Sequence, residues 1–480
     1  MYVKCDSVLK SEPVQLYIDT EIEPAGAKSI VSVLVKAWAE APFNRPNEIT
    51  TTLNIEYYVV YVTESGIQFL NDHKSESVRI PFNGVKEDCF SFVRPVIVGS
   101  EYRGTEKLKI RVMPELVGYA IVPSGFETAE ADGLEVKRED ITVFSAIPVP
   151  NTEIVYSGEA VLDSDMSDIL ASQSTVSVES VSVATDIMHI SGKVTTYVQY
   201  LKEGKIMGGT IVTPFDEDVL AKGIVDGAVA VPFAEPQGEV TTLSDGSVKV
   251  EGVISVKGFA YIPATYSVVT DAYSLTKDLN LKFCEAEIKE NVCISYDKSK
   301  FFGSVREDSF APACIAALAA PGITALNYSG MKPIKAEGIV GAQLIAEDSA
   351  GTPFGITAEI PFRTECYPLN ECAGTVSVYA NIADYQARLR QGGTIELSGE
   401  IGIKVLSEST ELIKYLCDYE EVGDKELSDA PIVTLYIVGK DETLFDVAKA
   451  LNADVGRLRE LNPEIGAEVA EGDKVIYFEN

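Results

Sequence analysis

Histidine, the side chain most often used for acid–base catalysis and zinc binding, occurs only twice in the chain, at His73 and His189. We expect a solvent-facing loop position for His73 and a strand surface or core position for His189. Two isolated histidines cannot form a histidine-rich metal site. Neither the G-x-S-x-G nucleophile motif nor the H-E-x-x-H zinc motif is present. The segment ISGKVTT is not a phosphate-binding loop either, because Ile187 stands where that motif needs its first glycine.

Carboxylates are too numerous to identify an active site by themselves. With 73 acidic residues, paired carboxylates occur in many places and no pair can be singled out. We therefore assign no catalytic, cofactor-binding or metal-binding residue, and we expect no cofactor and no enzyme activity. An enzyme with its site hidden in an unfamiliar β fold is the less favoured alternative.

The cysteines do not form a recognisable framework. None belongs to a C-x-x-C pair, so neither a zinc site nor a set of disulfides is indicated. We expect reduced, partly buried thiols in a cytosolic protein; Cys366 and Cys372 are close enough in sequence to bridge, but nothing else supports that bond. The eight cysteines are Cys5, Cys89, Cys284, Cys293, Cys314, Cys366, Cys372 and Cys417.

Net charge and hydropathy exclude several classes of partner. A formal net charge of −33 argues against nucleic acid, because nothing could neutralise a run of phosphates, and disfavours attraction to anionic lipids. The most apolar window, residues 311–326, is interrupted by Pro312 and Pro321, which limit it to a buried helix of roughly eight residues where a membrane span needs about 20. The first residues show no secretory signal. We expect no membrane insertion, and we expect Trp38 in a core.

Internal repetition organises most of the chain. The dipeptide Pro-Phe recurs at 81–82, 214–215 and 361–362. Gly192 and Gly338 lie 146 residues apart, Pro214 and Pro361 lie 147 apart, and Gly252 and Gly399 also lie 147 apart. One shared offset at three landmarks indicates a duplicated unit. A more divergent first copy contains Gly118, and its longer hairpin loop spans residues 63–77.

Each copy follows one predicted plan. A short helical or turn segment opens it, at residues 163–172 and 311–320 in the second and third copies. Two long hairpin-like stretches follow, in which Val or Ile alternates with polar residues, the period of a half-buried strand. A glycine within each long strand suggests a bulge or a close backbone approach, and the phenylalanine of Pro-Phe is expected to plug the core.

The predicted fold class is mainly β, with tandem sandwich-like repeats and a small C-terminal βααβ domain. Repeats are assigned to residues 1–145, 146–284 and 285–416. Residues 417–430, rich in acids and without periodicity, are assigned to a solvated linker, and residues 431–480 to the C-terminal module.

The C-terminal module has the most specific pattern. Apolar residues at Leu444, Val447, Ala448 and Leu451 have the spacing of one helix face. Thr443 and Asp446 have capping-box spacing. Asp454 is a good N-cap for a second helix, whose inner stripe is Val455, Leu458 and Leu461. Strands on both sides complete a strand, helix, helix, strand order.

This module resembles the LysM family. Family sequences run Y-x-V, G-D-T-L, I-A, L-x-x-x-N-P-x-I and V-x-x-G-x-x-I, and this chain matches from Tyr436 to Val475. In glycan-binding members, the N-acetylglucosamine groove lies between the loop before the first helix and the N-P-x-I loop. By resemblance, the candidate glycan- or partner-binding residues are Asp441, Glu442, Thr443, Asn462, Pro463 and Ile465.

One departure from the family pattern bears on the ligand. Asp441 stands where the family usually has glycine, so an added charge and Cβ could narrow the groove or repel a sugar. The groove loops also lack tryptophan and tyrosine for sugar stacking. We therefore favour docking to a protein partner, with binding of peptidoglycan or N-acetylglucosamine as the alternative.

The repeats resemble SPOCS domains, β-rich units of spore-forming Firmicutes. The resemblance rests on the segments MHISGKVTTYVQYL…TPF and IKAEGIVGAQLIA…IPF. Clostridial spore-coat morphogenesis proteins have this domain order, tandem SPOCS domains followed by one LysM module. That resemblance implies a non-enzymatic scaffold of coat assembly in the mother-cell cytoplasm, at the forespore surface. It implies docking through LysM to a coat morphogenetic ATPase like stage IV sporulation protein A. The cell-wall or cortex protein that binds peptidoglycan is the competing hypothesis, and self-association of the repeats is a further expectation.

Overall fold

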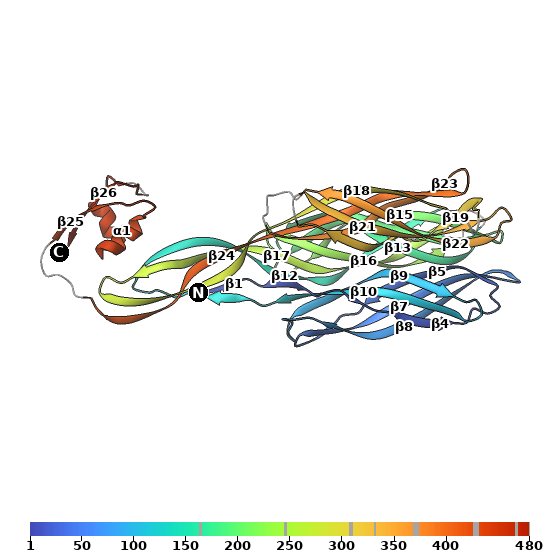
Figure 1. The fold of residues 1–480 in the computed structure, drawn as a ribbon, viewed down its shortest axis with the longest axis horizontal. Coiled ribbons are helices and arrows are strands. Elements are labelled where there is room, and N and C mark those ends of the chain that lie inside the picture. Colours follow the sequence, from blue (N-terminus) through green and yellow to red (C-terminus); the bar gives the residue numbers. More distant parts are fainter. Residues whose placement is uncertain are drawn as a thin grey trace.

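The computed structural model describes residues 1–162, 166–243, 247–306, 311–330, 333–367, 374–425, 432–465 and 469–479. Long antiparallel strands run along an elongated body, and both helices lie in a small module near the C-terminus (Figure 1). The predicted mainly β fold class and the strand, helix, helix, strand order of the module are confirmed.

The first unit consists of two antiparallel sheets that share one core. One sheet contains β5 (Ser29–Ala39), β6 (Phe43–Arg45), β7 (Glu48–Thr63) and β8 (Gly66–Pro81), with β7 in the centre. In the other, β10 (Leu108–Val122) pairs with β9 (Phe90–Arg103), β2 (Ser7–Lys10), β3 (Val14–Gln15) and β4 (Ile18–Ile22). A short pair joins β1 (Tyr2–Lys4) to β11 (Gly125–Glu127). Buried residues of β4, β7, β8 and β10 form a single cluster, so the unit is a sandwich.

The second unit has the same order of strands. Its first strand, β12 (Glu135–Ala160), leads into the meander β13 (Met166–Ala184), β14 (Ile187–Lys202) and β15 (Lys205–Leu220). The hairpin β16 (Val229–Thr242) and β17 (Val248–Tyr273) follows, and β17 pairs with β12. The meander and the hairpin sheet enclose the second core.

The third unit repeats this plan. Its first strand, β18 (Lys277–Arg306), pairs with the last strand, β24 (Thr394–Asp424), which also pairs with β23 (Thr375–Leu389). In the facing sheet, β21 (Ile334–Glu347) is flanked by β22 (Pro353–Cys366) on one side and by β19 (Cys314–Leu318) and β20 (Gly322–Tyr328) on the other. These strands enclose the third core.

The repeated glycines and phenylalanines form one recurring contact. Gly192 pairs with Phe215 across β14 and β15, and Gly338 pairs with Phe362 across β21 and β22. A Cβ on Gly192 would lie 2.8 Å from the Phe215 ring, and one on Gly338 would lie 2.6 Å from the Phe362 ring. Both rings are buried. The predicted close approach and the core position of phenylalanine are thus confirmed, because each ring covers the glycine of the neighbouring strand.

Side chains from all three units meet in shared clusters. One joins Leu34, Ala171 and Ala319, and a larger one joins residues of β5 and β7, β13 and β15, and β19 and β21. A third brings together aromatic residues of the three hairpin sheets, including Phe92, Tyr119, Phe233, Phe259 and Tyr261. The three units therefore surround a common centre, and Figure 1 shows their strands side by side along the body.

The helical or turn openings predicted for the second and third units are wrong, because strands occupy these positions. Residues 166–172 belong to β13, and Cys314–Leu318 forms β19, while residues 163–165 and 307–310 lie outside the described part. The segment at 311–320 is rich in alanine, a strong helix former, yet both segments pair with another strand of their sheet. Their small side chains, Ala171 and Ala319, fit the narrow three-unit cluster, so tertiary packing overrides helix propensity.

The long loop predicted at residues 63–77 is also wrong. β7 ends at Thr63 and β8 begins at Gly66, and these two residues pair across a tight turn. The polar residues that suggested a loop lie along β8, most of whose side chains are exposed. His73 is consequently a strand residue, and its Nε2 lies 3.0 Å from the Ser75 hydroxyl oxygen.

Two strands cross the predicted repeat boundaries. β12 runs through the boundary at 145–146, and β18 runs through that at 284–285. Residues 417–424 of the predicted acidic linker belong to β24, where the acids occupy an exposed strand tip paired with β18. Residues 426–431 lie outside the described part of the chain.

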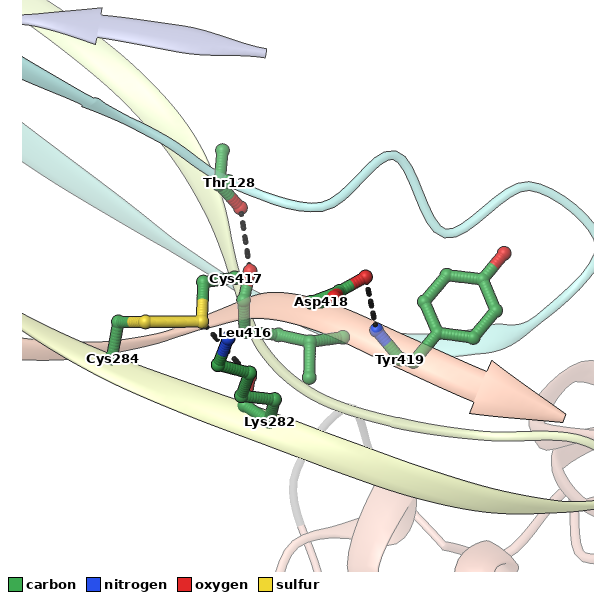
Figure 2. The surroundings of a disulfide bond; sticks show 7 residues. All are labelled: Thr128, Lys282, Cys284, Leu416, Cys417, Asp418 and Tyr419. Atoms are coloured by element: carbon green, nitrogen blue, oxygen red, sulfur yellow. Dashed lines mark hydrogen bonds between the residues drawn. A yellow bond between two sulfur atoms is a disulfide. The ribbon is translucent and has the colours of Figure 1, made fainter. Parts of the chain in front are cut away.

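A disulfide joins Cys284 of β18 to Cys417 of β24, with the Cα atoms 5.7 Å apart (Figure 2). The expectation of reduced thiols is therefore wrong for this pair, which are 133 residues apart in sequence but lie on neighbouring strands. The Thr128 hydroxyl donates a 3.3 Å hydrogen bond to the adjacent carbonyl of Leu416, which links the first unit to the third at this point. Cys366 is a buried free thiol, and Cys372 lies outside the described residues.

Candidate functional site

The C-terminal module comprises the described residues from 432 to 479. β25 (Ile432–Ile437) pairs with β26 (Lys474–Glu479), and α1 (Leu444–Leu451) and α2 (Val455–Leu461) lie between them in sequence. Thr443 caps α1 in a complete capping box with Asp446, and the Asp454 carboxylate caps α2 by accepting a 2.6 Å bond from the Arg457 amide. Both predicted caps are confirmed.

The core of the module includes a residue from the second unit. Leu444, Val447 and Leu458 of the predicted helix stripes are buried together with Val475 of β26. Tyr273, at the end of β17, completes this cluster and contacts the Phe445 ring with 5.2 Å between centroids. The module therefore packs on the turn between β17 and β18 in addition to being tethered by the chain.

Polar contacts reinforce this packing. The Tyr273 hydroxyl donates a 2.5 Å hydrogen bond to the Ala453 carbonyl, and the Asn452 amide donates to the Leu275 carbonyl at 3.0 Å. The Lys449 ammonium lies 2.5 Å from the Asp271 carboxylate. These contacts engage α1 and the connection between the helices, and they leave the sheet of the module free. Figure 1 shows the module at one end of the body, beside the tips of the long strands.

Three of the six candidate groove residues have structural partners within the module. The Glu442 carboxylate accepts bonds from the Tyr436 hydroxyl at 2.9 Å and the Gly439 amide at 2.7 Å, and Thr443 is the cap of α1. Asn462 is buried; its amide donates to the carbonyls of Leu458 and Ile476 and accepts from the Ile476 amide. These bonds fasten the two groove loops to neighbouring positions of the β25–β26 sheet.

The other three candidates are accessible to different degrees. Asp441 and Pro463 are exposed, and Ile465 is half-buried against the module core. Asp441 has a φ of +60°, in the left-handed region that glycine adopts most readily. Glycine, which is usual here in LysM sequences, would adopt this backbone without strain, and aspartate is among the side chains that tolerate the same conformation.

The outer face of the β25–β26 sheet is apolar and exposed. Val433 pairs with Phe478, and Leu435 pairs with Ile476, so these side chains form one contiguous surface. We call it the outer sheet face; its members and their exposed fractions are Val433 68%, Leu435 57%, Ile437 62%, Ile476 37% and Phe478 47%. Exposed apolar patches of this kind mark interaction sites.

Sequence reasoning did not find this face, although a signal for it was present. A strand buried on one side alternates apolar with polar residues. In contrast, IVTLYI and KVIYFE carry apolar residues on both faces. The inward residues Tyr436, Val475 and Tyr477 pack on the helices, and the outward ones have no cover within the described chain.

Comparison with protein-family models, with curated proteins and with solved structures gives no match.

Trp38 and His189 lie in the body, outside the module. Trp38 is half-buried rather than in a core, and it lines a cavity of about 780 Å³ between β5 of the first unit and β16 and β17 of the second. His189 lies on the strand surface, one of its two predicted positions, with its ring nitrogens 2.7 Å and 2.9 Å from the carboxylates of Asp216 and Asp218. The hydrogen bond to Asp218, together with the charge of Asp216, raises the pKa of His189.

Metal-binding groups and membrane-spanning helices are absent from the residues that the structure describes. Within them, no group of three or more His, Cys, Asp or Glu side chains is arranged to hold a metal ion. Among the helices of the same residues, none has the length and apolar character needed to traverse a bilayer.

Proposed function

We propose that the chain is a non-enzymatic scaffold of the bacterial spore coat, a SipL-like morphogenesis protein with tandem SPOCS domains and one LysM module. It acts in the mother-cell cytoplasm at the forespore surface. Its C-terminal module docks onto a coat morphogenetic ATPase of the stage IV sporulation protein A type. The resemblance of the sequence to these two families supports the assignment to coat assembly.

The outer sheet face is the observation that carries the docking hypothesis. Five apolar side chains on two paired strands offer a protein partner a surface that gains free energy when water is removed from it. The opposite side of the sheet packs on the helices, and the helices contact Tyr273 and Asp271. A partner bound to the outer sheet face would therefore not compete with the contacts that attach the module to the body.

Glycan binding is the alternative function of the module. Hydrogen bonds within the module already occupy Glu442, Thr443 and Asn462, and the exposed apolar side chains lie on the sheet rather than in the groove loops. Sugar sites usually combine polar groups with an aromatic platform, and the groove candidates contain no aromatic residue. These features favour a protein partner over N-acetylglucosamine.

A pull-down with the full-length chain tests this function. The purified ATPase should be retained by the wild-type protein, and purified peptidoglycan should not. The double variant Leu435→Glu, Phe478→Glu should weaken retention of the ATPase more than tenfold, because it places two charges in an apolar contact. Val155→Glu is the matched control, since Val155 is 75% exposed in β12, outside the module. Retention by peptidoglycan that chitin oligomers abolish would contradict the proposal.

A further inference from the structure

The centre of the body contains two related aromatic–lysine pairs, from the second and third units, and one equivalent cationic residue from the first. Phe233 of β16 pairs with Lys257 of β17, and Tyr379 of β23 pairs with Lys404 of β24. In the first unit, Arg94 of β9 occupies the position of Phe233 and Tyr379. The three units thus bring two cationic side chains, Arg94 and Lys404, to one shared aromatic cluster.

Lys257 and Lys404 use the same kind of backbone contact but have different electrostatic partners. Lys257 points toward the Val93 carbonyl of the first unit at 3.5 Å, and Lys404 donates a 2.7 Å hydrogen bond to the Pro232 carbonyl of the second. Glu235, two residues after Phe233, places its carboxylate 2.9 Å from the Lys257 ammonium. The residue two positions after Tyr379 is Asn381, a neutral amide. The third unit therefore lacks the carboxylate that neutralises the second unit's lysine.

Cation–π contacts with aromatic rings stabilise the charges of Lys404 and Arg94 in part, in place of a carboxylate. The Lys404 ammonium lies 4.4 Å from the centroid of the Phe233 ring and 5.1 Å from that of Tyr379, and the Arg94 guanidinium also lies 4.4 Å from the Phe233 centroid. Among the described residues, neither Lys404 nor Arg94 has a carboxylate oxygen within 4.0 Å. Burial, together with the charge of Arg94, lowers the pKa of Lys404 to about 7. A buried cation without an anion is costly, so this site favours either the neutral amine or a bound anion.

A cavity lies beside these groups. It has a volume of about 360 Å³, enough for a small organic molecule, and it lies among strands of all three units. Its lining includes Lys404, Arg94, Asn381 and the Tyr296 side chain. The buried Tyr296 hydroxyl has no hydrogen-bond partner among the described residues. These four groups border one space together with the Ser177 hydroxyl and the Lys298 ammonium. The Asn381 amide uses one of its two N–H donors on the Val176 carbonyl, at 3.3 Å, and the other stays available to a ligand.

We propose that this cavity binds a small monocarboxylate. The carboxylate of the ligand lies near Lys404 and Asn381 and pairs with the Lys404 ammonium, as the Glu235 carboxylate pairs with Lys257. The chemical class follows from the repeat, because the equivalent lysine of the second unit is satisfied by a carboxylate. A dianion is disfavoured since Glu179 and Asp297 line the same cavity. Glu179 forms ion pairs with Lys298 at 3.5 Å and with Lys193 at 3.9 Å.

Titration calorimetry with sodium butyrate tests this site in the full-length protein, with sodium chloride as the reference salt. Wild-type protein should bind butyrate in excess of chloride. Since the ammonium form of Lys404 is the one that attracts a carboxylate, binding should be roughly tenfold weaker at pH 8 than at pH 6. No butyrate binding, or binding that is equal at the two pH values or matched by chloride, would overturn the proposal.

Two variants separate this site from general anion binding. Asn381→Glu introduces the carboxylate that the second unit has, keeps Lys404, and should weaken butyrate binding more than tenfold. Lys404→Met should do the same by removing the charge. The double variant Lys257→Met, Glu235→Gln alters the related pair in the second unit and should leave butyrate affinity unchanged. If Asn381→Glu retains wild-type affinity in a folded protein, the site assignment is wrong.

Discussion

Lys257 and Lys404 occupy equivalent positions in β17 and β24, 147 residues apart. Of these two lysines, only Lys257 has a carboxylate oxygen of the described residues within 4.0 Å. The spacing agrees within one residue with the offset between the second and third Pro-Phe motifs and between the strand glycines of these two units. The repeated backbone thus places the two lysines in the same way. Their electrostatic surroundings differ because the third unit has Asn381 where the second unit has Glu235.

The stability of the protein should depend on pH through Lys404. The pKa of Lys404 is lowered from 10.5 to about 7 in the folded state. Between these values the unfolded chain binds more protons, so the contribution of Lys404 to stability rises with pH in that window. The free energy of unfolding of the wild type minus that of Lys404→Met should increase by about 2 kcal/mol from pH 7 to pH 9. Urea denaturation at each pH measures this difference in free energy of unfolding. If the difference is the same at pH 7 and pH 9, Lys404 has an ordinary pKa.

Gly338 should not tolerate a side chain. An alanine Cβ would lie 2.6 Å from the Phe362 ring and would also overlap the Ala325 carbonyl. We expect Gly338→Ala to lower the free energy of unfolding by roughly 1–3 kcal/mol, the usual cost of overpacking. Gly322→Ala is the control, because nothing lies within 4 Å of a Cβ there. Equal stability of both variants in urea would mean that the ring does not cover the glycine closely.

Asp441 should be replaceable by glycine but not by a branched residue. Glycine adopts a φ of +60° without strain. A residue whose side chain makes no local hydrogen bond loses about 1–2 kcal/mol of conformational free energy there. The free energy of unfolding of Asp441→Gly should therefore lie within about 0.5 kcal/mol of the wild-type value. Asp441→Val should lower the free energy of unfolding of the module by about 1 kcal/mol or more. Helix circular dichroism during thermal unfolding follows the module, which contains both helices of the described chain. A stable Asp441→Val variant would contradict the left-handed backbone.

Loss of the Cys284–Cys417 bond should destabilise the third unit. The bond closes a loop with a sequence separation of 133, and the chain-entropy model assigns such a loop roughly 5 kcal/mol. We expect Cys284→Ser to lower the Tm and to make it insensitive to reducing agent. Cys314→Ser, at an exposed free thiol, should keep the wild-type Tm. If a reductant leaves the Tm of the wild type unchanged, the bond contributes nothing to stability.

Local patterns in the sequence predicted the repeats and the module because both depend on short-range periodicity. The Pro-Phe motifs, Gly192, Gly338 and the helix caps all lie where their spacing placed them. Alternation of apolar residues likewise identified the long strands. These features need only neighbouring residues or one shared offset, so a single sequence contains them.

Long-range packing determined what the sequence did not reveal. Cys284 and Cys417 come together only because β18 pairs with β24 along its whole length, and the three-unit clusters require an arrangement that no local pattern encodes. The sequence predicts helix or turn for the segments that contain Ala171 and Ala319, but these two small residues lie together in a cluster shared by the three units. In the module, the outward apolar residues lie on β25 and β26, outside the groove motifs on which the resemblance to LysM rests.

Localisation of a fluorescent fusion in sporulating cells is the measurement that bears most directly on the proposed scaffold function. We predict that the full-length chain surrounds the forespore, that Leu435→Glu, Phe478→Glu is dispersed in the mother-cell cytoplasm at equal abundance, and that Val155→Glu behaves as the wild type. A wild-type fusion that does not concentrate at the forespore would contradict the coat assignment. Normal localisation of the double variant would contradict docking through the outer sheet face.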